Sequence, residues 1–136
     1  MQTLLVTGGA GFIGSCYVLK RCAAGDTVIN LDKLTYSGNP DNLFPLRDNP
    51  RHIFVEGDIG NAELVAYLLQ TYRPNAVVNF AAESHVDRSI LDPDAFVRTN
   101  VFPCFELSKT GGRFLLRLKR PHFAFFMCRP MKYSAL

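Results

Sequence analysis

With 136 residues, 48% of them hydrophobic, the chain is long enough for one globular domain or part of one. No apolar run is long enough to span a bilayer, and Met1 and Gln2 lead directly into a strand-like run without a secretory signal, so we expect a cytoplasmic protein. The net charge of +3 arises near the end of the chain, where seven Lys and Arg residues after Val101 stand against Glu106 alone.

Strands and helices alternate along the first eighty residues. Short apolar runs bounded by Gly, Asn and Pro predict buried parallel strands. We predict strands at 3–7, 27–31, 52–56 and 76–80. We predict helices at 12–23, from Asp41, from Asn61 to Tyr72, and from near Pro93. This alternation is typical of an α/β fold of the Rossmann type, a doubly wound parallel sheet with strand order 3-2-1-4.

A glycine-rich loop joins the first strand to the first helix. Gly8, Gly11 and Gly14 form the pattern Gly-x-x-Gly-x-x-Gly, a variant of the dinucleotide fingerprint. Glycines here permit a tight turn and let the backbone approach a pyrophosphate, and the helix N-terminus offers free N–H groups to the phosphates. An ordinary tight turn could contain the same glycines, so the surrounding elements must decide between the two interpretations.

Asp32 stands at the end of the second strand, where this fold places an acidic residue beside the adenosine ribose. Its carboxylate can accept hydrogen bonds from both ribose hydroxyls and would repel a 2′-phosphate. Because a strand, the glycine loop, a helix and Asp32 follow in this order, the sequence predicts a site for NAD in preference to NADP.

Asp58 and Ile59 follow the third strand and admit two interpretations. In one, the Asp58 carboxylate binds the exocyclic amine of adenine and Ile59 covers the ring. In the other, Asp58 is a strand-end residue that caps the next turn. The sequence alone favours neither.

Two longer stretches are more specific than any single motif. Asp-Lys-Leu-Thr-Tyr-Ser-Gly-Asn begins at Asp32, and Ala-Ala-Glu-Ser-His-Val-Asp-Arg-Ser-Ile begins at Ala81. Together with the glycine loop and Thr99-Asn100-Val101, they closely resemble the dTDP-glucose 4,6-dehydratase family of the extended short-chain dehydrogenase/reductase superfamily. The resemblance covers residues 1 to about 107.

The resemblance implies NAD contacts after each of the four strands. Besides the three glycines, these are Phe12, Ile13, Asp32, Lys33, Leu34, Thr35, Asp58, Ile59, Phe80, Ala81, Ala82, Glu83, Ser84 and Thr99. Ser84 would also touch the nucleotide sugar. We interpret His85 and Asp87 as parts of a structural hydrogen-bond cluster, and Arg88 is better explained in the same way than as a phosphate ligand.

The resemblance also implies a reaction whose catalytic residues this chain lacks. The family converts dTDP-glucose to dTDP-4-keto-6-deoxyglucose, a step in deoxysugar biosynthesis, with a bound NAD that takes up and returns a hydride, and its members form homodimers. Its acid–base groups lie in Thr-Asp-Glu and Tyr-x-x-x-Lys motifs, and neither motif occurs here. We therefore predict no catalytic residue and an inactive, truncated chain.

From about Ser108 the sequence departs from the family pattern and turns basic. The codons from Phe123 to Ala135 can be read in a shifted frame, by joining the last base of each codon to the first two bases of the next. Codon choices that the genetic code permits then give Arg-Phe-Leu-His-Val-Ser-Thr-Asp-Glu-Val-Phe-Gly. In this string the first Val and the Glu are the residues that the code forces. That string resembles the family's next strand and its Thr-Asp-Glu motif. We therefore divide the chain into an NAD-binding Rossmann half at 1–107, the N-terminal half of the fold, and an aberrant, frameshifted tail at 108–136. The apolar segments of this tail, 114–116 and 123–127, are expected to pack poorly.

Three rival functions carry less weight. Another epimerase or decarboxylase of nucleotide sugars would share the glycine loop, and a non-catalytic NAD-binding module would need no acid–base groups. Nucleic-acid binding is the weakest of the three, because only the basic tail supports it and we interpret that tail as a product of the reading frame. We therefore predict neither a nucleic-acid nor a membrane partner.

The four cysteines have neither the Cys-x-x-Cys spacing nor the histidine neighbours of a zinc site, so we predict no metal and no disulfide. Cys16 and Cys22 are expected to be small packing residues of the first helix, in which Phe12, Cys16 and Leu19 should share one face.

Overall fold

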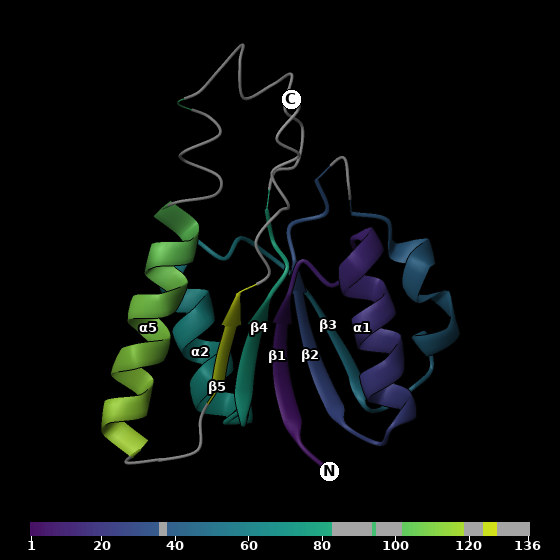
Figure 1. Ribbon diagram of the computed structural model, residues 1–136, viewed down its shortest axis with the longest axis horizontal. Coiled ribbons are helices and arrows are strands. Elements are labelled where there is room, and N and C mark those ends of the chain that lie inside the picture. Colours follow the sequence, from purple (N-terminus) through teal and green to yellow (C-terminus); the bar gives the residue numbers. More distant parts are fainter. Residues whose placement is uncertain (36–37, 83–93, 95–101, 119–123, 128–136) are drawn as a thin grey trace, which may run out of the picture.

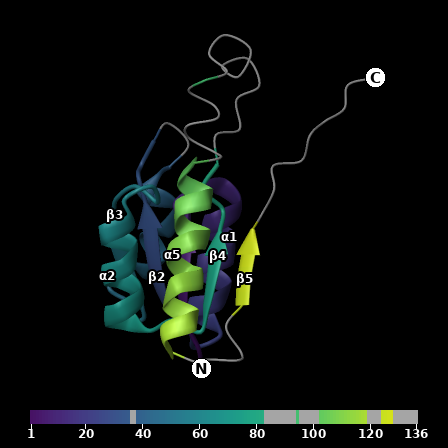
Figure 2. The same ribbon diagram turned by 90° about the vertical axis from the view of Figure 1, so that its left-hand side faces the viewer.

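The computed structural model describes residues 1–35, 38–82, 94, 102–118 and 124–127. These ranges form a five-stranded parallel sheet with helices on both faces (Figures 1 and 2). The strands are β1 (Thr3–Thr7), β2 (Thr27–Asp32), β3 (His52–Glu56), β4 (Ala76–Asn79) and β5 (Ala124–Met127), in the order β3-β2-β1-β4-β5. The predicted Rossmann-type fold and the order of its first four strands are confirmed, and β5 extends the sheet beyond β4.

The helices lie in two layers. α1 (Phe12–Ala23) and the 3-10 helix η1 (Pro40–Leu46) cover one face of the sheet, and α2 (Ala62–Tyr72) and α5 (Phe102–Leu118) cover the other (Figures 1 and 2). No helix in the described ranges is long and apolar enough to cross a membrane. The helix predicted near Pro93 falls in a region of which only residue 94 is described.

Alternate side chains of the central strands pack into two separate hydrophobic cores, one on each face of the sheet. Leu4 and Val6 face α1 and η1, whereas Leu5 and Ile29 face α2 and α5. Because both faces are covered, the central strands must be apolar on both sides, which explains their continuous hydrophobic runs in the sequence.

The face of α1 that enters the core differs from the predicted one. Its buried residues are Gly14, Ser15, Val18 and Cys22, whereas Phe12 is 84% exposed and Cys16 is also exposed. The predicted face of Phe12, Cys16 and Leu19 is therefore not the buried one, although Leu19 does pack against the core. The expectation that Cys16 is a packing residue was wrong, whereas Cys22 is buried as expected. The physical reason is the close approach of Gly14 to the end of β1, which sets the rotation of the helix and leaves its first side chain outside the core.

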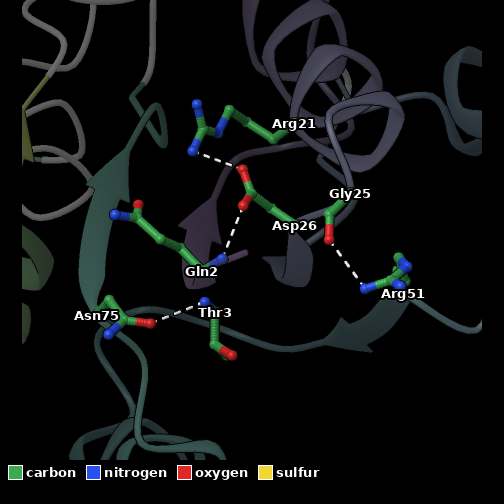
Figure 3. Close-up of polar contacts among 7 residues, drawn as sticks. All are labelled: Gln2, Thr3, Arg21, Gly25, Asp26, Arg51 and Asn75. Atoms are coloured by element: carbon green, nitrogen blue, oxygen red, sulfur yellow. Dashed lines mark hydrogen bonds and ion pairs between the residues drawn. The ribbon is translucent and has the colours of Figure 1, made fainter.

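Polar contacts bind the amino-terminal edge of the sheet together (Figure 3). The buried Asp26 carboxylate accepts a hydrogen bond from the Gln2 N–H and pairs with the Arg21 guanidinium. The Asn75 side chain accepts a hydrogen bond from the Thr3 N–H, which links the start of β4 to the start of β1. This edge is thus stabilised by contacts of the chain with itself.

The last described segments pack more closely than the sequence predicted. Phe114 of α5 is 8% exposed in the core shared with α2, and β5 pairs in parallel with β4. Phe125 also packs against that core, whereas Phe126 is 59% exposed at the open edge of the sheet. The burial of Phe114 differs from the expected poor packing, whereas β5 keeps half of its residues exposed, among them Met127 at 49%.

Candidate dinucleotide-binding site

The described residues that the sequence singled out lie along the carboxyl edge of the sheet. The glycine loop follows β1, Asp32 ends β2, Asp58 follows β3 and Phe80 follows β4. Because the strands are parallel, these positions share one edge, at the top of Figure 1. The chain leaves β1 for β2 on one side and β4 pairs with β1 on the other, so the glycine loop stands where the strand order reverses. Open α/β sheets bind their ligands at that point.

Two of the three motif glycines are required by the fold itself. Gly8 has a φ of +70°, and a Cβ there would lie 2.5 Å from the nitrogen of Ala81, just beyond β4. A Cβ on Gly14 would lie 2.2 Å from the Gly8 carbonyl oxygen. The absence of a side chain at Gly8 and Gly14 therefore lets the loop, the start of α1 and the end of β4 pack closely together, as expected for this motif.

Gly11 differs from the other two glycines. Within 4 Å, a Cβ on Gly11 would meet only the Gly8 carbonyl oxygen, at the ordinary contact distance of 3.4 Å. The fold therefore does not need glycine at this position. A phosphate group approaching the start of α1 would need a bare backbone there, so Gly11 favours a dinucleotide loop over an ordinary tight turn.

The N-terminus of α1 is open to an anion, in contrast with that of α2. Gly11 is the N-cap of α1 and provides no side-chain hydrogen bond, and the first turn contains no acidic residue. In α2, the Asn61 side chain accepts a hydrogen bond from the Leu64 N–H, and Glu63 lies in the first turn. The positive end of α1 is therefore available for phosphate groups, whereas that of α2 is neutralised by its own residues.

The buried Asp32 carboxylate connects two loops of the site. One oxygen accepts a hydrogen bond from the Ala10 N–H at 2.8 Å, and the other accepts one from the Leu34 N–H at 2.9 Å. Each carboxylate oxygen has a further lone pair, so both can still accept ribose hydroxyls. The exposed Thr35 follows in the same loop. The contact of Asp32 with the glycine loop was not predicted from the sequence, because no local sequence pattern indicates it.

Asp58 is held by neighbouring protein groups. The Lys33 ammonium donates to one carboxylate oxygen at 2.7 Å and the Gly60 N–H donates to the other at 2.8 Å. Burial raises the pKa of the Asp58 carboxyl, but both hydrogen bonds and the charge of Lys33 outweigh it and hold this pKa below its usual value. The interpretation of Asp58 as a turn cap is confirmed, and its contact with an adenine amine remains a prediction.

The apolar residues of the predicted site differ in exposure. Phe12 and Ile13 project from the start of α1 and are 84% and 62% exposed. Ile59 is buried in the core on the α2 side, so little of its side chain is available to cover a ring. Phe80 is partly buried against Tyr17, with ring centroids 5.3 Å apart.

Part of the predicted site lies outside the described residues. Ala81 and Ala82 are described and partly buried, and Ala81 lies beside Gly8. Glu83, Ser84 and Thr99 lie outside the described residues, as do His85, Asp87 and Arg88. The roles assigned to these six residues remain predictions.

Two buried polar residues support the site and were missed in the sequence. The Thr7 hydroxyl donates a hydrogen bond to the Asn79 side-chain oxygen, which also accepts one from the Ala81 N–H at 3.1 Å. The pair joins the carboxyl ends of β1 and β4 and holds Ala81 beside Gly8. A polar residue at the end of an otherwise apolar strand was the signal that could have identified them.

Comparison with known proteins identifies relatives of similar sequence. Residues 5–112 match the family model described as GDP-mannose 4,6 dehydratase. A dTDP-glucose 4,6-dehydratase from Xanthomonas campestris pv. campestris (strain B100) is 60% identical over 101 residues, which are 74% of this chain and 29% of that protein. A dTDP-glucose 4,6-dehydratase from Neisseria gonorrhoeae is 43% identical over 128 residues, covering 91% of this chain and 37% of its own length.

Solved structures show the same relationship. A dTDP-glucose 4,6-dehydratase from Bacillus anthracis in complex with NAD superposes with a TM-score of 0.75 at 36% identity, over 93% of this chain and 37% of that one. The enzyme of the same name from Streptomyces venezuelae, with NAD and TYD bound, has a TM-score of 0.75 at 48% identity, over 82% and 36% of the two chains.

The chain spans about a third of the length of the curated relatives that it matches. The family match nevertheless covers most of the chain and includes every strand that forms the described site. The chain belongs to the GDP-mannose 4,6 dehydratase family.

Proposed function

We propose that the chain is the N-terminal, NAD-binding part of a dTDP-glucose 4,6-dehydratase, which converts dTDP-glucose to dTDP-4-keto-6-deoxyglucose. The observation that carries this proposal is the 60% identity to a curated dehydratase of that name over 101 residues. The fold alone does not choose this activity, because UDP-glucose 4-epimerases superpose equally well at 28–34% identity.

The described residues fit NAD. The bare backbone at Gly11 and the uncapped start of α1 suit a pyrophosphate, and the Asp32 carboxylate suits a ribose with free hydroxyls and disfavours a 2′-phosphate. When bound, NAD would supply the hydride acceptor and donor of the reaction. The role of this chain would be to hold and orient it.

We expect no turnover from this chain by itself. Its sequence lacks both the Thr-Asp-Glu and the Tyr-x-x-x-Lys motif, so it offers no acid–base groups to act on a sugar. Titration with NAD and NADP by calorimetry tests the binding part of the proposal, and an assay for the 4-keto product from dTDP-glucose tests the catalytic part. The expected result is preferential binding of NAD without product. Equal affinity for NADP would contradict the assigned role of Asp32.

The same proposal assigns residues 108–136 to a shifted reading frame. The family match ends at residue 112, close to the point where the sequence turns basic. The position of β5 supports this assignment. β5 pairs with β4, and the codons of β5 give Phe-Leu-His-Val when they are read in the shifted frame. Thymine-rich codons specify apolar residues in more than one frame, which explains why the altered segment can still form an edge strand.

Sequencing the DNA from codon 100 onward tests this assignment. We expect a shifted open frame that continues through the two missing motifs, and a frame that closes without them would contradict the assignment. A protein expressed from the restored frame is expected to bind dTDP-glucose, with Ser84 among the contacts, to form a homodimer and to produce the 4-keto sugar.

A non-catalytic NAD-binding module is the second candidate, favoured by the absence of acid–base motifs in the chain. The same DNA sequence distinguishes the two, since a module would have no dehydratase motifs in any frame. The cytoplasmic location remains a prediction from the sequence.

A further inference from the structure

The peptide groups on both sides of Ala10, in the middle of the glycine loop, are held by four hydrogen bonds, one of which the Gly11 N–H donates to the Gly8 carbonyl oxygen at 3.3 Å. The Ala10 N–H donates to Asp32 at 2.8 Å. The Ala10 carbonyl oxygen accepts from the Asn39 N–H at 3.1 Å and from the Asn42 side-chain amide at 3.0 Å. Ala10 itself is fully buried. We call this set of hydrogen bonds around Ala10 the clamp.

The two donors to the Ala10 carbonyl belong to an element anchored independently of the loop. Asn39 is the N-cap of η1, where its side chain accepts from the Asp41 N–H, and Asn42 lies in the first turn of that helix. Leu43 and Leu46 bury η1 in the core beneath α1. The exposed side chain of Asn42 reaches away from its own helix to the loop.

Fixing the Ala10 carbonyl also fixes the next N–H group. In a trans peptide the carbonyl and the N–H point in opposite directions, so the bond from Asn42 acts together with those from Asn39 and from the Gly11 N–H to Gly8 to orient this peptide. Gly11 is the residue from which α1 starts. The clamp therefore helps to set how the backbone enters the start of α1, where the proposed pyrophosphate would bind.

From this geometry we infer that Asn42 is a positioning residue of the dinucleotide site. It does not touch the ligand, and it acts by holding the Ala10–Gly11 peptide in the orientation that binding requires. The inference rests on the proposed NAD-binding function and extends it to a residue outside the glycine motif and outside the predicted contacts.

The test compares three single variants of the full chain. Asn42→Ala removes the amide donor, and Asn42→Asp places a carboxylate against the Ala10 carbonyl oxygen. Asn49→Ala is the matched control, because the Asn49 side chain also bonds a backbone group, the Arg51 N–H, at 3.0 Å but far from the loop. For each, the Kd for NAD is measured by calorimetry and the thermal midpoint by circular dichroism.

We expect Asn42→Ala to raise the Kd for NAD by about three- to tenfold, the loss typical of one hydrogen bond. Asn42→Asp should raise it further, and Asn49→Ala should leave it unchanged, even if the thermal midpoints of all three variants fall equally. Unchanged affinity in both Asn42 variants would overturn the inference, and so would an equal loss in Asn49→Ala. Failure of the unaltered chain to bind NAD would instead overturn the proposed function on which the inference rests.

Discussion

Phe105 and Phe114 lie on the same helix, α5, in opposite environments. The Phe105 side chain is 60% exposed, with the Lys109 ammonium 5.9 Å from its ring centroid, whereas Phe114 is 8% exposed in the core that α5 shares with α2. Nine residues correspond to two and a half helical turns, which places the two rings on opposite sides of the helix. α5 is therefore amphipathic across the proposed boundary at residue 107.

Truncation of these two rings should have very different effects. Phe114→Ala is expected to lower the free energy of unfolding by about 3 kcal/mol, because it removes a buried ring and leaves a cavity. Phe105→Ala should change it by less than about 0.5 kcal/mol. Urea denaturation followed by circular dichroism measures both, and equal values would show that the region after residue 107 has no place in the core.

Substitutions at Gly11 and Gly14 should separate ligand binding from folding. Gly14→Ala forces a Cβ to within 2.2 Å of the Gly8 carbonyl oxygen and should lower the thermal midpoint. Gly11→Ala meets nothing closer than 3.4 Å, so the thermal midpoint should stay the same while the Kd for NAD rises by about tenfold or more. If Gly11→Ala binds NAD like the unaltered chain, the loop is an ordinary turn.

The bond between Thr7 and Asn79 should contribute to stability. Thr7→Val keeps the shape of the side chain but removes the buried donor, so we expect a loss of about 1 kcal/mol in the free energy of unfolding. Thr3→Val, at the partly exposed start of the same strand, is the control and should change it by less than about 0.5 kcal/mol. Chemical denaturation of the two variants gives the comparison, and indistinguishable losses would argue against a role for the buried bond.

His52 should make the fold less stable in mild acid. Burial lowers the pKa of His52, and a hydrogen bond with the Leu46 backbone opposes this only in part. The unfolded chain, with a histidine pKa of about 6.5, therefore takes up a proton before the folded chain does as the pH falls. Stability due to this group is complete above that pH and is lost as the pH falls toward the lower pKa of the folded state.

Replacement of the imidazole tests this effect. We expect the thermal midpoint of His52→Gln to vary less between pH 7 and pH 5 than that of the unaltered chain. An unchanged slope in thermal melts over that range would assign the pH dependence to other groups.

The local pattern of the sequence was enough to predict the first four strands, α1, α2, the glycine loop and Asp32. Each depends on residues that are neighbours in the chain. Apolar runs bounded by Gly or Pro predict strands, and Asn61 begins α2 because its own side chain caps the helix. The strand order was predicted as that of the Rossmann-type fold, which the glycine loop and the alternating elements indicate.

Tertiary structure decided which side chains those elements present to one another. The rotation of α1 depends on the approach of Gly14 to Gly8, so the sequence pattern assigned Cys16 to the packing residues although it is exposed. Asp32 meets Ala10 across 22 residues, and Thr7 meets Asn79 across 72. Such contacts depend on how separate elements pack in three dimensions, and the sequence contains no local periodicity that records them. The sequence by itself therefore predicted where a dinucleotide would bind, and only the packing of β1, β2, β4 and η1 around the loop decided which residues hold that loop in shape.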